Sequence, residues 1–199
     1  MRGAVKFVVG ILVVVIVVAG VALITLINRG LSSRQRPTAR EYGIARAVRH
    51  LATPMSMRHA RNPVRLTNGV LAEARAHWAD HCATCHGNDG SGNTEIGRNL
   101  YPKVPDMRSE RTQDLTDGEL FSIIKNGVRL TGMPAWGDPA GHDDEDNWKL
   151  VQFIRHLPKI TPNELEEMKS MNPVSPMEAK EEKEEEQFLK GGEPPAHHH

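Results

Sequence analysis

Two cysteines and a histidine lie close together at residues 82 to 86, where Cys82 and Cys85 are separated by two residues and His86 follows directly. This is the spacing of a covalent attachment site for a c-type haem. Each thiol can add across one vinyl group, and the histidine behind the second thiol reaches the iron from the same side. A thioredoxin-like dithiol or half of a zinc site is the alternative, but a zinc site needs a second pair of ligands and the chain has only two cysteines. The sequence therefore predicts one covalent haem c, with Cys82 and Cys85 as the thioethers and His86 as an iron ligand.

The beginning of the chain is a long apolar segment. No charged residue lies between Lys6 and Arg29, and the run from Phe7 to Ile27 consists almost entirely of aliphatic residues and glycine. A helix of this length, rising about 1.5 Å per residue, spans the roughly 30 Å hydrocarbon core of a bilayer. A cleaved signal peptide is the alternative, but the segment is too long for the apolar region of such a peptide. Residues 1–28 are therefore predicted to be a retained transmembrane signal anchor.

The two flanks of the chain differ in charge. Residues 1–65 hold eleven Lys and Arg residues and one acidic residue, whereas 161–199 hold four basic and ten acidic residues. The Arg-rich part, 29–65, is interrupted by prolines and is predicted to be an extended linker with one or two helical turns around 41–50. It could lie on anionic lipid headgroups or on an acidic partner, or serve as a solvated tether.

The C-terminal residues 161–199 are rich in proline and glutamate and are predicted to be an extended or disordered tail, because they cannot bury enough apolar area to offset the entropy of ordering. A solvated helix over 178–190 is compatible with this composition. The last three residues, His197 to His199, either bind a metal ion or have no role.

The central residues 66–160 are predicted to form the haem domain, and their apolar residues recur at helical spacing. Thr67 or Asn68 can cap a helix that runs into the cysteine motif. Thr116 begins a second helix with capping-box spacing, which ends at Gly127. A third helix starts near residue 143 or 144 and stops at Pro158. Since no segment shows the sustained alternation of a strand, the fold is predicted to be mainly α.

With the cysteine motif, the helix before it and a closing helix that ends in Trp-x-Leu-Val-x-Phe-Ile-x-x-Leu, the segment 66–159 resembles a membrane-anchored bacterial cytochrome c with one haem and His/Met ligation, of the class I type. The resemblance implies a small helical cytochrome c domain around one covalent haem, in which the first and last helices cross near the cofactor. One departure is Ala74, which stands where the family often has glycine at that crossing.

The resemblance also implies the second iron ligand. The sequence from 126 to 136 looks like the family loop that delivers an axial methionine, and Met133 lies in it between Gly132 and Pro134, which make a rigid turn. A thioether suits the soft iron of a haem. Met107 is the alternative, but it follows His86 closely and leaves less chain to round the haem edge. The predicted metal ligands are therefore His86 and Met133.

Further haem contacts are expected from physical suitability and from the resemblance, with ordinary packing as the alternative for each. Three side chains are candidates to hydrogen-bond the haem propionates: Arg98, Tyr101 and Trp136. The apolar pocket that keeps water from the iron is predicted to be lined by Leu100, Leu120, Ile124, Val128, Leu130 and Val151.

An iron with both His and Met ligands has no open position, which favours reversible one-electron transfer. We therefore expect an electron carrier rather than an enzyme, as a subunit of a respiratory or photosynthetic electron-transfer complex. Its expected partners are other membrane electron-transfer subunits or redox proteins and the lipid bilayer, with no nucleic acid. The alternatives are a haem enzyme or a gas or peroxide sensor in which the methionine leaves, and a structural subunit whose haem is incidental.

Two arguments disagree about the side of the membrane on which the haem domain lies. Counting Lys and Arg near the apolar segment places its carboxyl side in the cytoplasm, because positive charge is retained there. In the family that this chain resembles, however, haem attachment takes place outside the cytoplasmic membrane. We give the haem argument more weight and expect the bacterial inner membrane, with the haem domain on the periplasmic side.

Overall fold

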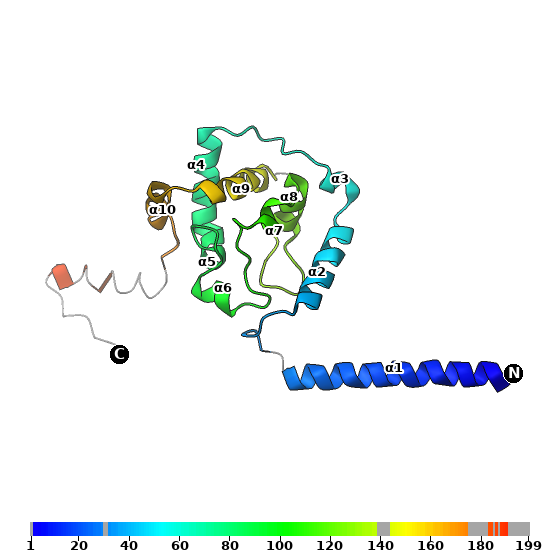
Figure 1. The fold of residues 1–199 in the computed structure, drawn as a ribbon. Helices are drawn as coiled ribbons and strands as arrows, with labels where there is room; N and C mark the ends of the chain where they lie inside the picture. Colours follow the sequence, from blue (N-terminus) through cyan, green and yellow to red (C-terminus); the bar gives the residue numbers. More distant parts are fainter. Residues whose placement is uncertain are drawn as a thin grey trace. The chain divides into compact units, whose positions relative to one another are not determined.

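The computed structural model describes residues 2–29, 32–138 and 144–174, together with 183, 184, 186 and 188–190. The chain divides into two compact units, Met1–Gln35 and Arg36–His199. The regular elements of the described residues are helices, and none of these residues lies in a β-strand (Figure 1). The prediction of a mainly α fold is confirmed.

The first unit contains one long helix, α1, which spans Arg2–Arg29. Large apolar side chains are exposed along its length. Its stretch Val5–Asn28 has 24 residues, about 36 Å of helix, and is long and apolar enough to cross a membrane by length and composition. The helix is therefore a candidate membrane span.

The helix that leads into the cysteine motif is α4, Asn68–His77. The hydroxyl of Thr67 caps it by accepting a hydrogen bond from the backbone N–H of Val70 at 3.2 Å. The chain continues through a wider π-helical turn, η1 (Trp78–Cys82), into a short helix, α5 (Ala83–His86). One continuous helical path thus carries both cysteines and the following histidine at its end.

Helix α4 packs against the closing helix α9, Glu145–His156, as Figure 1 shows. Ala74 is buried in this core at 1 % exposure, and its small side chain lets the two helices approach closely. Leu150 and Phe153 of α9 are buried in the same core. After α9 the chain tightens into a 3₁₀ turn, η2 (Leu157–Lys159), which is where the sequence predicted the helix to stop.

Helix α8, Asp117–Asn126, is the second helix predicted from the sequence. Thr116 and Glu119 form its capping box, each side chain accepting a hydrogen bond from the other residue's backbone N–H. The ring of Phe121 stacks on Trp148 of α9 with 4.0 Å between ring centroids. These contacts fix α8 against the crossing of α4 and α9.

Two short helices lie in the connections between the longer ones. Helix α6 spans Glu95–Asn99 and helix α7 spans Glu110–Gln113. The sequence did not predict them, because four or five residues are too few to show a helical period.

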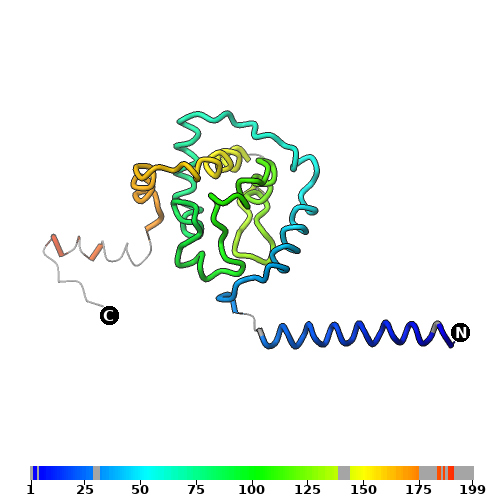
Figure 2. The backbone as a smooth tube through the Cα atoms, in the orientation of Figure 1, coloured from blue at the N-terminus to red at the C-terminus, as the bar shows by residue number. Residues whose placement is uncertain are grey.

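The segment 36–65 is folded, whereas the sequence predicted an extended linker. Helix α2 spans Ala39–Ala52, and Thr38 and Glu41 form a capping box at its start. Helix α3, Met55–Arg58, follows and packs against α8. Figure 2 shows this segment running around the edge of the domain before the chain enters α4.

Specific contacts hold this segment to the domain. The Nδ1 atom of His50 in α2 lies 2.8 Å from Oε1 of Glu119 in α8. At Gly118 a Cβ atom would overlap the carbonyl oxygen of Met57 in α3, so α3 lies directly on the backbone of α8. The second unit therefore includes the Arg-rich segment as part of its fold.

The beginning of the predicted C-terminal tail is also helical, as α10, Pro162–Lys169. Met168 of this helix is fully buried, and the carboxylate of Glu164 lies 2.8 Å from Nε2 of His156 and 3.5 Å from Arg75. The extended tail predicted from residue 161 does not hold for these residues, because one buried apolar side chain and a capping box are enough to order the helix.

Of the helix predicted over 178–190, only 183, 184, 186 and 188–190 are described, and there the N–H of Lys190 donates to the carbonyl of Glu186 at 3.2 Å. His197 to His199 lie outside the described residues.

Candidate functional site

The second unit contains a cavity of about 350 Å³, which is in the lower part of the range for small-molecule and cofactor sites. The predicted site residues that line it are Cys82, Cys85, His86, Met133 and Trp136. They come from opposite ends of the domain sequence, since the first three end the path of α4 and α5 and the last two follow α8. The fold therefore brings both halves of the predicted site to one cavity.

Hydrogen bonds fix the backbone around the cysteine motif. The indole N–H of Trp78 donates to the carbonyl of Gly87 at 2.9 Å, and the Thr94 hydroxyl donates to the carbonyl of Cys85 at 3.0 Å. The N–H of Gly92 donates to the carbonyl of His86 at 2.7 Å. The residues that follow the motif therefore fold back onto it, and these hydrogen bonds hold the motif at the cavity wall.

The two cysteines are free thiols, not a disulfide. Burial raises the pKa of Cys82 to about 12, and the neighbouring Cys85 adds to the effect. Burial also raises the pKa of Cys85. Dithiol oxidoreductases have a lowered thiol pKa instead. The electrostatics of this pair therefore disfavour the thioredoxin-like alternative.

His86 is buried, at 8 % exposure, and its ring centroid lies 5.5 Å from that of Trp78. Burial lowers the pKa of His86 to about 4, so its imidazole is neutral at pH 7 and can offer a lone pair to a metal. Its Nδ1 atom is buried without a hydrogen-bond partner among the described residues. Unpaired buried polar atoms are rare, which indicates that this ring is fitted to a further group in the cavity.

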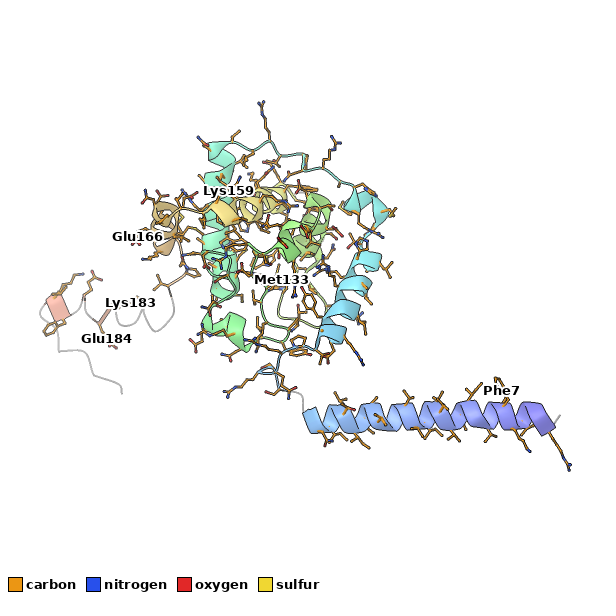
Figure 3. All side chains as sticks on the ribbon, viewed as in Figure 1. Phe7, Met133, Lys159, Glu166, Lys183 and Glu184 are labelled. Atoms are coloured by element: carbon orange, nitrogen blue, oxygen red, sulfur yellow. The ribbon has the colours of Figure 1, made fainter. Side chains whose placement is uncertain are left out.

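The loop after α8 carries Met133 into the lining of the same cavity (Figure 3, where Met133 is labelled). Gly127 starts the loop with φ +64°, and a Cβ atom there would lie 2.7 Å from the carbonyl oxygen of Met133. The N–H of Val128 donates to that carbonyl at 3.1 Å, and the N–H of Met133 donates to the Thr131 hydroxyl at 3.1 Å. The loop is closed on itself by these bonds, which fixes the backbone of the predicted ligand.

Met107, the alternative ligand, also lines the cavity. Its backbone N–H donates to the carbonyl of Gly90 at 2.8 Å, and its side chain packs against the core. Both methionines line the cavity, so the lining alone does not show which of them is the iron ligand. Met133 therefore stays the predicted ligand.

The three side chains predicted to hydrogen-bond the haem propionates differ in whether they line the cavity. Trp136 lines the cavity, and its backbone N–H donates to the carbonyl of Ile124 at 3.0 Å. Arg98 is absent from the lining, and its guanidinium donates to Asn93 at 2.9 and 3.2 Å. Tyr101, which is 38 % exposed, is absent from the lining too. Only Trp136 of the three is positioned at the site by the described contacts.

Some of the residues predicted to form the apolar wall line the cavity, and others do not. Leu100, Leu120, Ile124 and Val128 line the cavity, as predicted. Val151 is buried in the core but does not line the cavity. Leu130 was predicted wrongly: its side chain is 91 % exposed, because the residue sits in the turn before Met133 with φ +64°.

The sequence missed the basic rim of the cavity. It is lined by Tyr42 and Arg49 of α2, by Lys103 in the connection between α6 and α7, and by Arg111 of α7. The available signal was the Thr38–Glu41 capping box, which predicts a helix start at 39. Nothing in the sequence showed that this helix would pack beside the haem motif.

The residues present fit a covalently attached haem. Two thiols, a neutral imidazole and a thioether line one cavity whose other walls are mainly apolar. Thiols at this spacing suit covalent attachment, and imidazole and thioether are established axial donors to haem iron.

The match to a family model agrees with this fit. The family described as cytochrome C oxidase, cbb3-type, subunit III matches residues 69–154. A solved structure, the reducing HAO-like protein complex of Kuenenia stuttgartiensis, aligns with a TM-score of 0.42 and 18 % identity over 48 % of this chain and 46 % of that chain. The chain thus spans less than half the length of that neighbour. No curated protein matches. The family match and the residues of the cavity support a cytochrome c domain over residues 69–154.

Proposed function

We propose that this protein is a membrane-anchored carrier of single electrons, with one covalent haem c bound in the cavity between α5 and the loop after α8. The observation that carries the proposal is the shared cavity of Cys82, Cys85, His86 and Met133. When bound, the haem supplies a reversible one-electron couple between ferrous and ferric iron.

The chain's own residues hold the cofactor and set its surroundings. Cys82 and Cys85 would form the thioether links to the haem, and the neutral ring of His86 and the thioether of Met133, on its hydrogen-bonded loop, would bind the iron. With both of these ligands bound, the iron would have no open position for a substrate, and the weak thioether donor would favour the ferrous state compared with a second histidine. Leu120, with the other apolar residues of the lining, excludes water.

We propose further that α1 crosses the bacterial inner membrane and that the cytochrome domain lies on the periplasmic side. The length and composition of α1 support the span, and the chemistry of haem attachment supports the side. An anchored carrier diffuses in two dimensions, which suits electron exchange with other membrane subunits or redox proteins of a respiratory or photosynthetic complex. The matching family, which is named for a subunit of an oxidase, supports partners of this kind.

An optical spectrum of the purified protein, oxidised and then reduced, tests the proposal. We expect the haem c bands, the weak red absorption band of ferric iron bound by a methionine sulfur, and no change when carbon monoxide is added to the reduced form. A reduced spectrum that shifts with carbon monoxide would contradict the carrier, because the sixth position would then be open. Absence of covalent haem after denaturation and extraction would contradict the role of the cysteines.

A further inference from the structure

We propose that Arg49 of α2 and Arg111 of α7 bind the propionate carboxylates of the haem, so that α2 is part of the cofactor site. Helix α2 lies outside the residues matched by the cytochrome family, 69–154, and nothing in that match assigns it a role. The inference rests on the proposed function, because it concerns the same haem.

Charge is the first argument. The lining of the cavity includes the guanidinium groups of Arg49 and Arg111 but no aspartate or glutamate among the described residues. Two guanidinium groups beside one cavity repel each other unless an anion lies with them. The two propionates of a haem are the carboxylates that such a site would bind, and guanidinium groups bind carboxylates through paired N–H donors.

The position of the cations is the second argument. Arg49 is half-buried and Arg111 is exposed although both line the cavity, so they lie at its mouth, whereas the leucines and isoleucines of the lining form its interior. A haem in such a cavity would have its apolar ring inside and its carboxylates at the mouth, because burying an unpaired carboxylate is strongly unfavourable. The two arginines therefore lie where the haem carboxylates are expected.

The third argument is that Arg111 is held in place and that Arg49 shares a helix face with the residue that holds it. The Arg111 guanidinium lies over the ring of Tyr42, 5.0 Å from its centroid. A guanidinium stacked on a ring face keeps its N–H groups directed to the sides, where they can bind an anion. Tyr42 and Arg49 are seven residues apart on α2, which is about two turns, and they therefore share one face of the helix.

Helix α2 is itself fixed to the domain. His50 lies 2.8 Å from the Glu119 carboxylate, and the Nε–H of Arg58 donates to the carbonyl of Thr53 at 2.9 Å just beyond the end of α2. By contrast, Arg98, the arginine expected from the sequence to bind a propionate, donates to Asn93 and does not line the cavity. The arginines at the mouth take the role that was expected of Arg98.

The test uses the full chain with its haem, in detergent, and compares Arg49→Gln and Arg111→Gln with Arg40→Gln. Arg40 is an exposed arginine of the same α2 helix that does not line the cavity, so it controls for a loss of charge on the helix. Resonance Raman spectra of the reduced proteins report the propionate bending modes directly. We expect these modes to shift in R49Q and R111Q and to match the wild type in R40Q.

The reduction potential gives a second readout. Loss of a cation beside the haem favours the ferric state, and we expect the ferrous-to-ferric ratio at a fixed electrode potential to fall at least threefold, about 28 mV for a one-electron couple at 59 mV per tenfold. Arg49→Lys retains the charge and should keep the potential near that of the wild type. If R49Q yields no haem protein, the comparison of R111Q with R40Q decides.

Propionate modes and potentials that are the same in R49Q, R111Q and R40Q would overturn the inference. That outcome leaves the carrier function intact, since the wild type would still show covalent haem and a one-electron couple. A wild type without covalent haem would instead contradict the proposed function.

Discussion

Replacing Glu119 by alanine is expected to destabilise the domain by removing both the cap of α8 and a contact that holds α2. Its carboxylate accepts a hydrogen bond from the backbone N–H of Thr116 at 2.9 Å and lies 2.8 Å from Nδ1 of His50. Burial acts to raise the pKa of Glu119, but the hydrogen bonds from Thr116 and His50 outweigh burial and hold the pKa below its ordinary value. The fold therefore stabilises the charged carboxylate, which caps α8 and fastens α2.

The magnitude follows from these two contacts. Loss of a helix cap costs about 1 kcal/mol. The side chain of His50 is 54 % exposed, so solvent screening limits its contact with Glu119 to about 1 kcal/mol. We expect Glu119→Ala to lower the free energy of unfolding at neutral pH by about 2 kcal/mol, and Glu119→Gln, which keeps one acceptor, to lower it by about half as much.

Urea unfolding of the detergent-solubilised haem protein, followed by circular dichroism, measures this loss. Glu166→Ala is the control, because Glu166 pairs with Lys169 on the exposed surface of α10 and its loss should be small. The pKa of Glu119 is lowered by folding, so its contribution is complete above the unfolded pKa, about 4.3, and is lost as the pH falls through the folded pKa. If E119A costs no more than E166A, or if the cost does not shrink in acid, the reasoning is wrong.

Other substitutions test the remaining parts of the site and fold. Met133→Leu should abolish the weak red ferric band, whereas Met107→Leu should leave it; the reverse result would make Met107 the ligand. Met168→Ala should lower the free energy of unfolding by about 2–5 kcal/mol, because this methionine is fully buried, and urea unfolding would show it. Gly118→Ala should separate α3 from α8, because its Cβ would overlap the carbonyl of Met57, and faster proteolysis between residues 36 and 65 would report the separation.

The parts of the fold that sequence reasoning predicted are those set by local signals. The attachment motif needs only the spacing of Cys82, Cys85 and His86. Capping residues such as Thr67 and Thr116 start helices through hydrogen bonds within three residues of the chain. Each of these features is encoded within a few residues, so each could be recognised without knowledge of the tertiary structure.

The parts that it missed depend on contacts between distant residues. Only one or two helical turns were expected around 41–50, whereas α2 spans Ala39–Ala52. The apolar residues Ile44, Val48 and Leu51 of this helix are exposed, and it is Tyr42 that lines the cavity. Leu130 is apolar and lies three residues before Met133, but a backbone with φ +64° turns it to solvent. Apolar character predicts burial on average, and the direction of a side chain in a turn depends on backbone angles that composition does not encode.

The packing of α2 also bears on the conflict over orientation. The positive-inside rule applies to short loops near a span, whereas folded domains are translocated largely regardless of their charge. Arg49 lines the cavity and Arg58 donates to the carbonyl of Thr53, so part of the basic charge of 29–65 belongs to a folded unit. The number of Lys and Arg residues near α1, which favoured a cytoplasmic domain, is therefore weaker evidence about orientation. The chemistry of haem attachment, which does not depend on that count, then supports the proposed periplasmic position.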